Sequence, residues 1–235
     1  MNLLTFDTST EVMSVAVQCT LGGGVQLWQH SSPGGAQTST KLIPVIQGLM
    51  AQAGLQFEQL DVLAFGRGPG SFTGLRTACS VAQGLAFGAN LKVLPIDTLL
   101  AVAEEARHQI AAAVESYQVM ALLDARMDEM YGASYLFHGG LWTRTSDYLL
   151  LRPQDLTCAP TLTLAGNVFG IYDARLPVTL ARRVPVLPTA TAMLRLAPAL
   201  LAAGGAVPAA QALPLYIRDK VASTTAERAT AKAVS

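Results

Sequence analysis

Residues 66–76 read GRGPGSFTGLR and directly follow an apolar run at 62–65. The apolar run predicts a buried strand, and residues 72–88 predict a helix. A glycine-rich turn between a strand and a helix is typical of a place where another group approaches the backbone closely. That group could be a phosphate, another helix or another chain, so this stretch bears on both fold and function.

Strand-like and helix-like runs alternate along the chain, which predicts an α/β fold. The expected strands lie at 2–7, 12–19, 25–31, 62–65, 92–96, 119–123, 130–137, 141–149 and 162–165, and the expected helices at 39–53, 72–88, 98–113 and 189–203. A short extended segment is expected at 213–217. Strands joined by helices imply mixed sheets with helices on their faces. We therefore expect an N-terminal lobe at 1–103, a C-terminal lobe at 104–222 and a mobile tail at 223–235.

The charge balance argues against a large nucleic-acid-binding face. Among 235 residues, 16 are Lys or Arg and 16 are Asp or Glu, so the net charge is zero. A face that binds phosphates normally produces a basic excess. If nucleic acid is bound, we expect another subunit to supply most of the positive charge.

Targeting and metal-binding signals are not found in the sequence. The chain has no uninterrupted apolar run of about 18 residues and no basic N-terminal leader. Its cysteines, Cys19, Cys79 and Cys158, lie far apart, and they form neither a disulfide framework nor a zinc motif. None of the three histidines forms HxxxH. These features predict a cytoplasmic protein with no membrane span and no metal site.

A phosphate-binding loop is one candidate site, formed by Asp7, Ser9, Gly68, Gly70 and Ser71. A carboxylate followed by hydroxyls at the end of a strand can hold hydrated Mg²⁺ or orient a phosphate. The same pattern also fits an Asx or Ser/Thr turn at a strand exit. The residues alone leave both interpretations open.

The glycine loop matches known nucleotide fingerprints poorly. It lacks the GK[ST] ending of a Walker A loop, and Ser71 stands where a dinucleotide fingerprint has its third glycine. Pro69 removes a backbone donor. Ser71 is not in a GxSxG motif and has no histidine marked as its base, so a peptidase is not expected. The cluster Asp124, Arg126 and Asp128 could be a site or a salt-bridged turn.

A protein interface is the second candidate site. The 72–88 helix has small residues in two rows, Gly74, Ala78 and Ala82 in one and Ser80, Gly84 and Gly88 in the other. The 39–53 helix has apolar residues on a second face, whereas a surface helix normally keeps one face polar. The expected interface residues are Ile43, Gln47, Met50, Thr77, Ser80, Gly84 and Phe87. A helix buried in a larger single core would explain the same pattern.

Four stretches together resemble the TsaB family, also called YeaZ. They are FDTST at 6–10, GPGSFTGLR at 68–76, LLDARMDEMYGASY at 122–135 and LPLYIRD at 213–219. The resemblance covers the chain from its start to near its end. It implies a two-lobe fold of the actin and sugar-kinase type. It also implies a role in making threonylcarbamoyladenosine beside the tRNA anticodon.

The resemblance further implies a non-catalytic subunit. The catalytic relative TsaD carries a metal-binding HxxxH, and Thr98 and Val102 stand at those two positions here. The family's first two helices bind TsaD or a second TsaB, and the complex, which uses ATP and Mg²⁺, also recruits the ATPase TsaE and engages tRNA. Family members often show a histidine where this chain has Thr38. The competing hypothesis is a stand-alone nucleotide-binding ATPase that uses Asp7 and the 66–71 loop.

Overall fold

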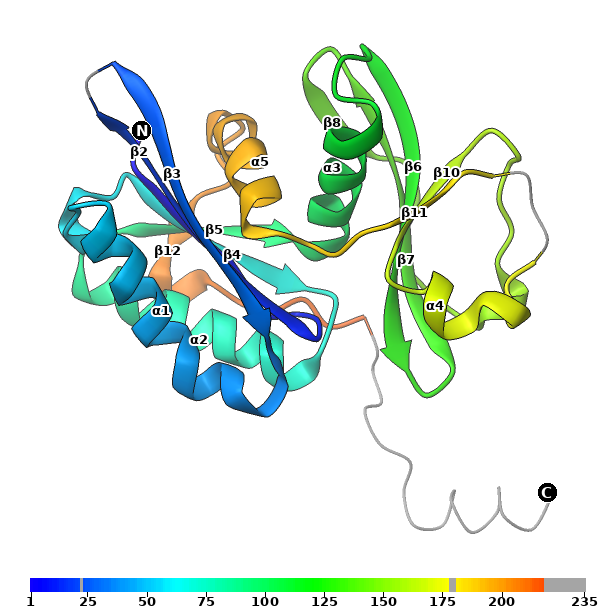
Figure 1. Cartoon of the computed structure of the whole chain (residues 1–235), viewed down its shortest axis with the longest axis horizontal. Helices are drawn as coiled ribbons and strands as arrows, with labels where there is room; N and C mark the ends of the chain where they lie inside the picture. The colour runs from blue at the N-terminus through cyan, green and yellow to red at the C-terminus, as the bar shows by residue number, and fades with distance from the viewer. Residues whose placement is uncertain (22, 178–180, 218–235) are drawn as a thin grey trace, which may run out of the picture.

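The first of two mixed sheets is formed mainly by the N-terminal part of the chain. The computed structural model describes residues 1–21, 23–177 and 181–217. The strand order is β12-β5-β4-β1-β2-β3 (Figure 1). The strands are β1 (Leu3–Asp7), β2 (Val12–Leu21), β3 (Gly24–Pro33), β4 (Val62–Gly68), β5 (Lys92–Asp97) and β12 (Val207–Pro208).

The second sheet is formed by the middle of the chain. Its strand order is β11-β10-β6-β7-β8, and β9 also pairs with β7. The strands are β6 (Ser116–Arg126), β7 (Glu129–His138), β8 (Leu141–Arg144), β9 (Leu149–Leu151), β10 (Thr163–Gly166) and β11 (Arg183–Pro185). The predicted α/β class is therefore confirmed.

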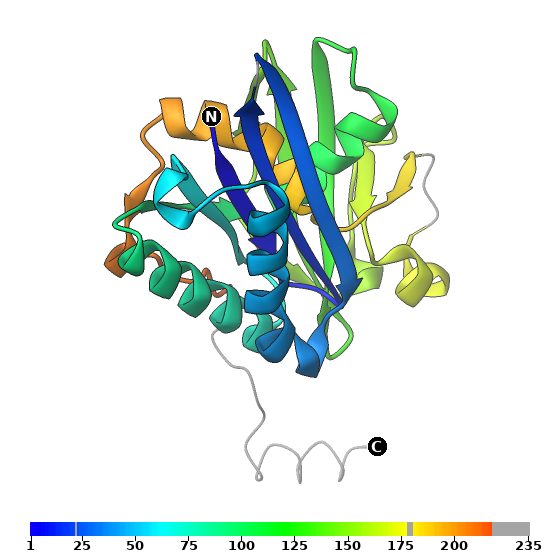
Figure 2. The same cartoon turned by 60° about the vertical axis from the view of Figure 1, so that its left-hand side comes forward.

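The helices form three layers around these sheets. Helices α1 (Thr38–Gln52) and α2 (Phe72–Gly88) pack on the outer face of the first sheet, and α3 (Thr98–Ile110) and α5 (Ala190–Ala202) lie between the sheets (Figures 1 and 2). The short α4 (Phe169–Tyr172) packs on the far face of the second sheet. None of the described helices is long and apolar enough to cross a membrane.

The chain returns to the first lobe near its C-terminal end, which the predicted 104–222 boundary did not anticipate. Ala190, the first residue of α5, accepts a hydrogen bond from Thr5 Oγ1 at 2.8 Å and donates its N–H to Ser14 Oγ at 2.9 Å. Strand β12 then pairs with β5. The second lobe is therefore an insertion between elements of the first. The predicted tail, 223–235, lies outside the described residues.

One predicted strand differs from the structure, and the predicted extended segment at 213–217 lies outside the sheets. The expected strand at 141–149 is divided into β8 and β9, because the backbone N–H of Ser134 in β7 bonds to Ser146 Oγ instead of to a strand partner. Residues 213–217 form no strand in the described structure. A backbone hydrogen bond holds this segment against the glycine loop, because Leu215 N–H donates to the Arg67 carbonyl at 2.7 Å.

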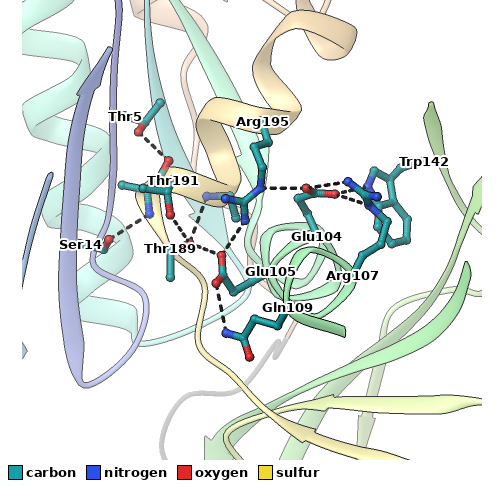
Figure 3. A network of polar contacts seen from close by, with 12 residues as sticks. Thr5, Ser14, Glu104, Glu105, Arg107, Gln109, Trp142, Thr189, Thr191 and Arg195 are labelled. Carbon is teal, nitrogen blue, oxygen red and sulfur yellow. Dashed lines mark hydrogen bonds and ion pairs between the residues drawn. The ribbon is translucent and has the colours of Figure 1, made fainter. Parts of the chain in front are cut away.

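A buried carboxylate joins α3 to elements on both sides of it. Glu104 is 2% exposed and accepts hydrogen bonds from Arg107 of α3, Arg195 of α5 and Trp142 of β8. Neighbouring Glu105 accepts from Arg195 Nη2 at 2.7 Å and from Thr189 at 2.8 Å. Figure 3 shows these side chains converging from three elements. We call these six residues the Glu104 network.

A second carboxylate joins the lobes at the start of α3. Asp97 Oδ1 accepts the N–H of Leu99, which caps the helix. Its Oδ2 accepts the hydroxyls of Tyr135 and Tyr148, both at 2.6 Å, from the second lobe. Burial, together with the Asp97 charge, raises the pKa of Tyr148 to about 12. Both tyrosines therefore remain donors at neutral pH.

The Glu104 network predicts a large loss of stability when its carboxylate is removed. Glu104→Ala leaves Arg195 Nε and Trp142 Nε1 without their acceptor, while Arg195 Nη2 keeps its bond to Glu105, and breaking a buried ion pair costs about 3–5 kcal/mol. The control is Asp173→Ala, which removes an exposed ion pair with Arg183 and should cost about 1 kcal/mol or less. Urea unfolding of both variants measures the difference. Equal losses would contradict the assigned role of the network.

Candidate functional site

The glycine loop is filled by the chain's own backbone. A Cβ atom at Gly70 would lie 2.5 Å from the carbonyl oxygen of Ser9, and one at Gly74 would overlap the carbonyl oxygen of Thr8. Ser71 N–H donates to the Ser9 carbonyl, and Thr8 Oγ1 donates to the Gly74 carbonyl, both at 2.7 Å. The turn after β1 is thus docked directly onto the start of α2. The group that approaches these glycines is another part of the same chain.

Gly68 is required by a second internal contact. Its φ is +116°, and a Cβ there would lie 2.6 Å from the Leu215 carbonyl oxygen. Its N–H donates to Thr98 Oγ1 at 3.0 Å. The loop therefore also positions the C-terminal segment and the first residue of α3.

Asp7 lies beneath this docked turn and is fully buried. Its Oδ1 accepts the Ser9 N–H at 2.9 Å and the Ser9 hydroxyl at 2.7 Å, which is the Asx-type turn considered from the sequence. Its Oδ2 has no hydrogen-bond partner among the described residues and faces Gly66, where a Cβ would overlap it. Burial raises the pKa of Asp7 from 3.8 to about 6, and the Ser9 hydrogen bonds oppose this shift.

A cleft of about 470 Å³ lies between the lobes. It is lined by residues 9–11, 34–35, 70–73 and 75 of the first lobe, 123–127, 131 and 167 of the second, and 215–217. Of the predicted loop residues, Ser9, Gly70 and Ser71 line this cleft, whereas Asp7 and Gly68 do not. The structure thus divides the predicted set into a cleft-lining part and a buried structural part.

The second-lobe wall of the cleft is held by a polar cluster around Asp124. Asp124 Oδ1 accepts the Tyr172 hydroxyl at 2.6 Å, and its Oδ2 pairs with Arg126 at 3.3 Å. Asn167 accepts the Asp124 N–H at 2.9 Å, and its Nδ2 lies 3.3 Å from Glu11 Oε2 of the first lobe. Sequence reasoning missed Glu11, Asn167 and Tyr172. No local motif marks them, because only the fold brings them to Asp124.

The outer surface of α1 and α2 carries most of the predicted interface residues. Ile43 is 40% exposed and Phe87 is 84% exposed. Gln47, Ser80 and Gly84 are also exposed, and Thr77 is half-buried. The prediction is wrong for Met50, which is 3% exposed and packs in the core beneath α1. Ile43 and Gln47 lie on the outer side of α1, whereas Met50 lies at the border of the buried stripe formed by Leu42, Ile46 and Leu49.

A shallow, open groove of about 430 Å³ lies beside α2 on this surface. It is lined by Ser80, Gln83, Gly84, Phe87, Ala209 and Ala210. Gln83 Nε2 donates to the Ala212 carbonyl at 2.9 Å and so holds the 209–211 turn against the helix. Sequence reasoning did not include this turn, because its contact with α2 depends on the return of the chain.

Two mixed sheets, with α3 and α5 between them and a cleft between the lobes, define a two-lobed α/β protein. A family model, TsaD: tRNA N6-adenosine threonylcarbamoyltransferase, matches residues 29–197. The chain belongs to the TsaB family, also called YeaZ, within this wider TsaD family.

Individual relatives support that assignment along nearly the whole chain. The tRNA threonylcarbamoyladenosine biosynthesis protein TsaB of Haemophilus influenzae is 35% identical, over 94% of this chain and 95% of that protein. TsaB of Escherichia coli is 32% identical, over 94% and 96%. The solved structure of YeaZ from Pseudomonas aeruginosa is 35% identical, covers 92% of this chain and 99% of its own, and superposes with a TM-score of 0.80.

Paired substitutions in α2 test the docked loop. Gly74→Ala forces Thr8 away from the helix and should destabilise the protein by about 1–3 kcal/mol. Gly84→Ala meets no atom within 4 Å and should stabilise it by about 0.5–1 kcal/mol through helix propensity. Chemical denaturation of both variants gives the comparison. A neutral effect of Gly74→Ala would contradict the close docking.

The buried carboxylate of Asp7 predicts a pH-dependent difference between the wild type and Asp7→Asn. Because the folded-state pKa is raised above 3.8, the folded protein binds the proton more tightly, and wild-type stability falls as pH rises through about 6. The asparagine does not titrate. Between pH 4 and pH 8 the stability difference should therefore move in favour of Asp7→Asn by up to about 3 kcal/mol. A pH-independent difference would show that Asp7 is not desolvated.

Proposed function

We propose that this chain is the TsaB subunit in the biosynthesis of tRNA threonylcarbamoyladenosine, and that it binds and activates a TsaD-like catalytic subunit without being catalytic itself. The main observation that supports this proposal is the apolar surface of the two outer helices, α1 and α2. Phe87 is 84% exposed beside the α2 groove, and large exposed apolar side chains grouped around a groove mark interaction surfaces.

The outer row of α2 suits close packing with a partner helix. Its members Ser80, Gly84 and Gly88 are exposed, and a Cβ at either glycine would meet nothing within 4 Å. The opposite row, Gly74, Ala78 and Ala82, is buried on the first sheet. The sheet therefore accounts for one row of small residues, and a partner accounts for the other.

The two positions at which TsaD carries its metal-binding histidines are occupied here by Thr98 and Val102. Their surroundings support the proposal that this chain is not catalytic. Thr98 is fully buried and accepts the Gly68 N–H, and Val102 is fully buried in the core between the sheets. Both side chains therefore have structural roles. Within the described ranges, no group of three or more His, Cys, Asp or Glu side chains is placed to hold a metal ion.

The remaining partners follow from the family resemblance. We place the TsaE-like ATPase, ATP and Mg²⁺ with the assembled complex, and tRNA contact with the complex as a whole. The zero net charge of this chain supports a minor share of the tRNA contacts. We also propose that the complex containing this chain acts in the cytoplasm.

A stand-alone nucleotide-binding ATPase is the second candidate, favoured by the interlobe cleft. Its volume of about 470 Å³ falls in the range of small-molecule sites. Asp7 argues against it, because its carboxylate is enclosed beneath the turn and does not line the cleft. A peptidase is less well supported still, because no described residue lining the cleft beside Ser71 is a histidine.

Charged substitutions on α2 test the proposed partner surface. Ser80→Arg and Gly84→Arg place a long cation in the groove, and each should weaken binding to the TsaD-like subunit by at least about 30-fold, the effect of losing a central contact. Thr143→Arg, on an exposed position of β8, is the matched control. Calorimetric titration measures the affinity, and circular dichroism verifies folding. Unchanged affinity in the folded α2 variants would refute the assignment.

A further inference from the structure

Arg67, the second residue of the glycine-rich stretch, lies on an irregularity of its strand. In the pairing of β4 with β5, Gly66 lies opposite Ile96 and Gly68 lies opposite Asp97. Arg67 is therefore the extra residue of a β-bulge, a feature that turns a side chain in a new direction and is common beside functional sites. The bulge thus gives the Arg67 side chain a direction that a regular strand would not.

The side chain of Arg67 is half-buried and has no partner for its charge. Its Nε is shielded from solvent and finds no hydrogen-bond acceptor within residues 1–21, 23–177 and 181–217. No carboxylate of these same ranges forms an ion pair with it. A shielded donor without an acceptor is costly. The side chain therefore fits a ligand that supplies an acceptor.

A second guanidinium group, from Arg144 of the second lobe, shares the surroundings of Arg67. Arg144 is exposed on β8, the edge strand of its sheet, and its Cζ lies 3.9 Å from the centre of the Tyr148 ring. Burial and the Asp97 carboxylate raise the pKa of Tyr148 to about 12. The charges of Arg67 and Arg144 oppose this rise in pKa, so both guanidinium groups lie near the Tyr148 hydroxyl.

Asp97 does not neutralise these two cations. Its Oδ1 accepts the N–H of Leu99, and its Oδ2 accepts the hydroxyls of Tyr135 and Tyr148. In the described structure neither arginine forms an ion pair with Asp97. One carboxylate beside two guanidinium groups leaves an excess of one positive charge. The site therefore favours an anion that accepts hydrogen bonds from arginine.

We propose that Arg67 and Arg144 bind a phosphate group of the RNA that the assembled complex engages. This inference rests on the proposed function, which places the chain in a complex that modifies tRNA. A guanidinium group can donate two parallel hydrogen bonds to a phosphate, and the exposed position of Arg144 on β8 lets a polymer reach the site from solvent. The zero net charge of the chain agrees with contact to a few phosphates instead of a broad basic face.

The phosphate site is separate from the interlobe cleft and from the proposed partner surface. Neither Arg67 nor Arg144 lines the cleft or the α2 groove. The two arginines belong to β4 and β8, whereas the partner surface is formed by α1 and α2 on the outer face of the first sheet (Figures 1 and 2). A TsaD-like subunit bound to those helices need not cover the arginines.

Binding of a tRNA transcript with an adenosine beside its anticodon tests the site. Fluorescence anisotropy measures the affinity of the transcript for the complex with the TsaD-like subunit between about 50 and 200 mM salt. Arg67→Gln and Arg144→Gln should each weaken binding about three- to tenfold and lower the slope of log K against log salt by about 1. The matched control is Arg152→Gln, which removes an equal charge at another exposed position of the second lobe and should change neither quantity.

Two further measurements separate this inference from the proposed function. Circular dichroism verifies folding, and calorimetry verifies that each variant still binds the TsaD-like subunit. RNA affinity and salt slope that stay unchanged in a folded, complex-forming Arg144→Gln overturn the inference and leave the proposed function intact. Loss of TsaD-like subunit binding in both variants also overturns it, because the arginines would then contact that protein.

The isolated chain provides the test if no complex forms. It is titrated with the same transcript at about 20 mM salt, where phosphate contacts are strongest. Affinity lost in Arg67→Gln and retained in Arg152→Gln would support the inference although the proposed function had failed. Absence of RNA binding would overturn it.

Inorganic phosphate distinguishes a free phosphate from a phosphate of RNA. At constant ionic strength, we expect the isolated chain to show no saturation by inorganic phosphate below about 10 mM, because a single small anion makes few contacts. Saturation below that concentration that is lost in Arg144→Gln would assign the site to a free phosphate and overturn the RNA assignment.

Discussion

The docking of the 8–9 turn onto the glycine loop is the contact on which the rest of the structure depends. The carbonyl groups of Thr8 and Ser9 occupy the space that side chains at Gly74 and Gly70 would fill. This fixes where α2 begins and which of its faces meets the sheet. The row Ser80, Gly84 and Gly88 is then left outside. The glycine loop resembles a phosphate-binding loop in sequence, but in the structure it is a site of close backbone packing. This packing orients the proposed partner surface.

The glycine loop also contacts α3, which takes part in the interactions that hold the two lobes together. Gly68 bonds to Thr98 at the start of α3, and α3 carries Asp97, its capping residue, and Glu104. Each carboxylate bonds to side chains of the second lobe, Tyr135 and Tyr148 in one case and Trp142 in the other. One core also includes residues of both sheets. These contacts join the two lobes into a single body.

The sequence predicted the elements well where local patterns determine them. The glycine-to-helix boundary at 72–88 was correct because loop and helix signals are local. The return of α5 and β12 to the first lobe was missed, because their partners Thr5, Ser14 and β5 lie far away in the sequence and no local pattern marks the contact. Met50 was misplaced because it lies only about 20° from Ile43 around the helix axis, at the border between the buried and the exposed face of α1. The cleft cluster of Glu11, Asn167 and Tyr172 has no sequence signal at all.

We infer that this chain contributes a partner surface and that its glycine loop is closed by its own backbone. Calorimetric titration of the isolated chain with ATP and Mg²⁺, followed by titration with the TsaD-like subunit, tests this most directly. We expect no measurable nucleotide binding or turnover by the isolated chain, and saturable 1:1 binding of the TsaD-like subunit through α1 and α2. Tight nucleotide binding with turnover by the isolated chain would contradict it.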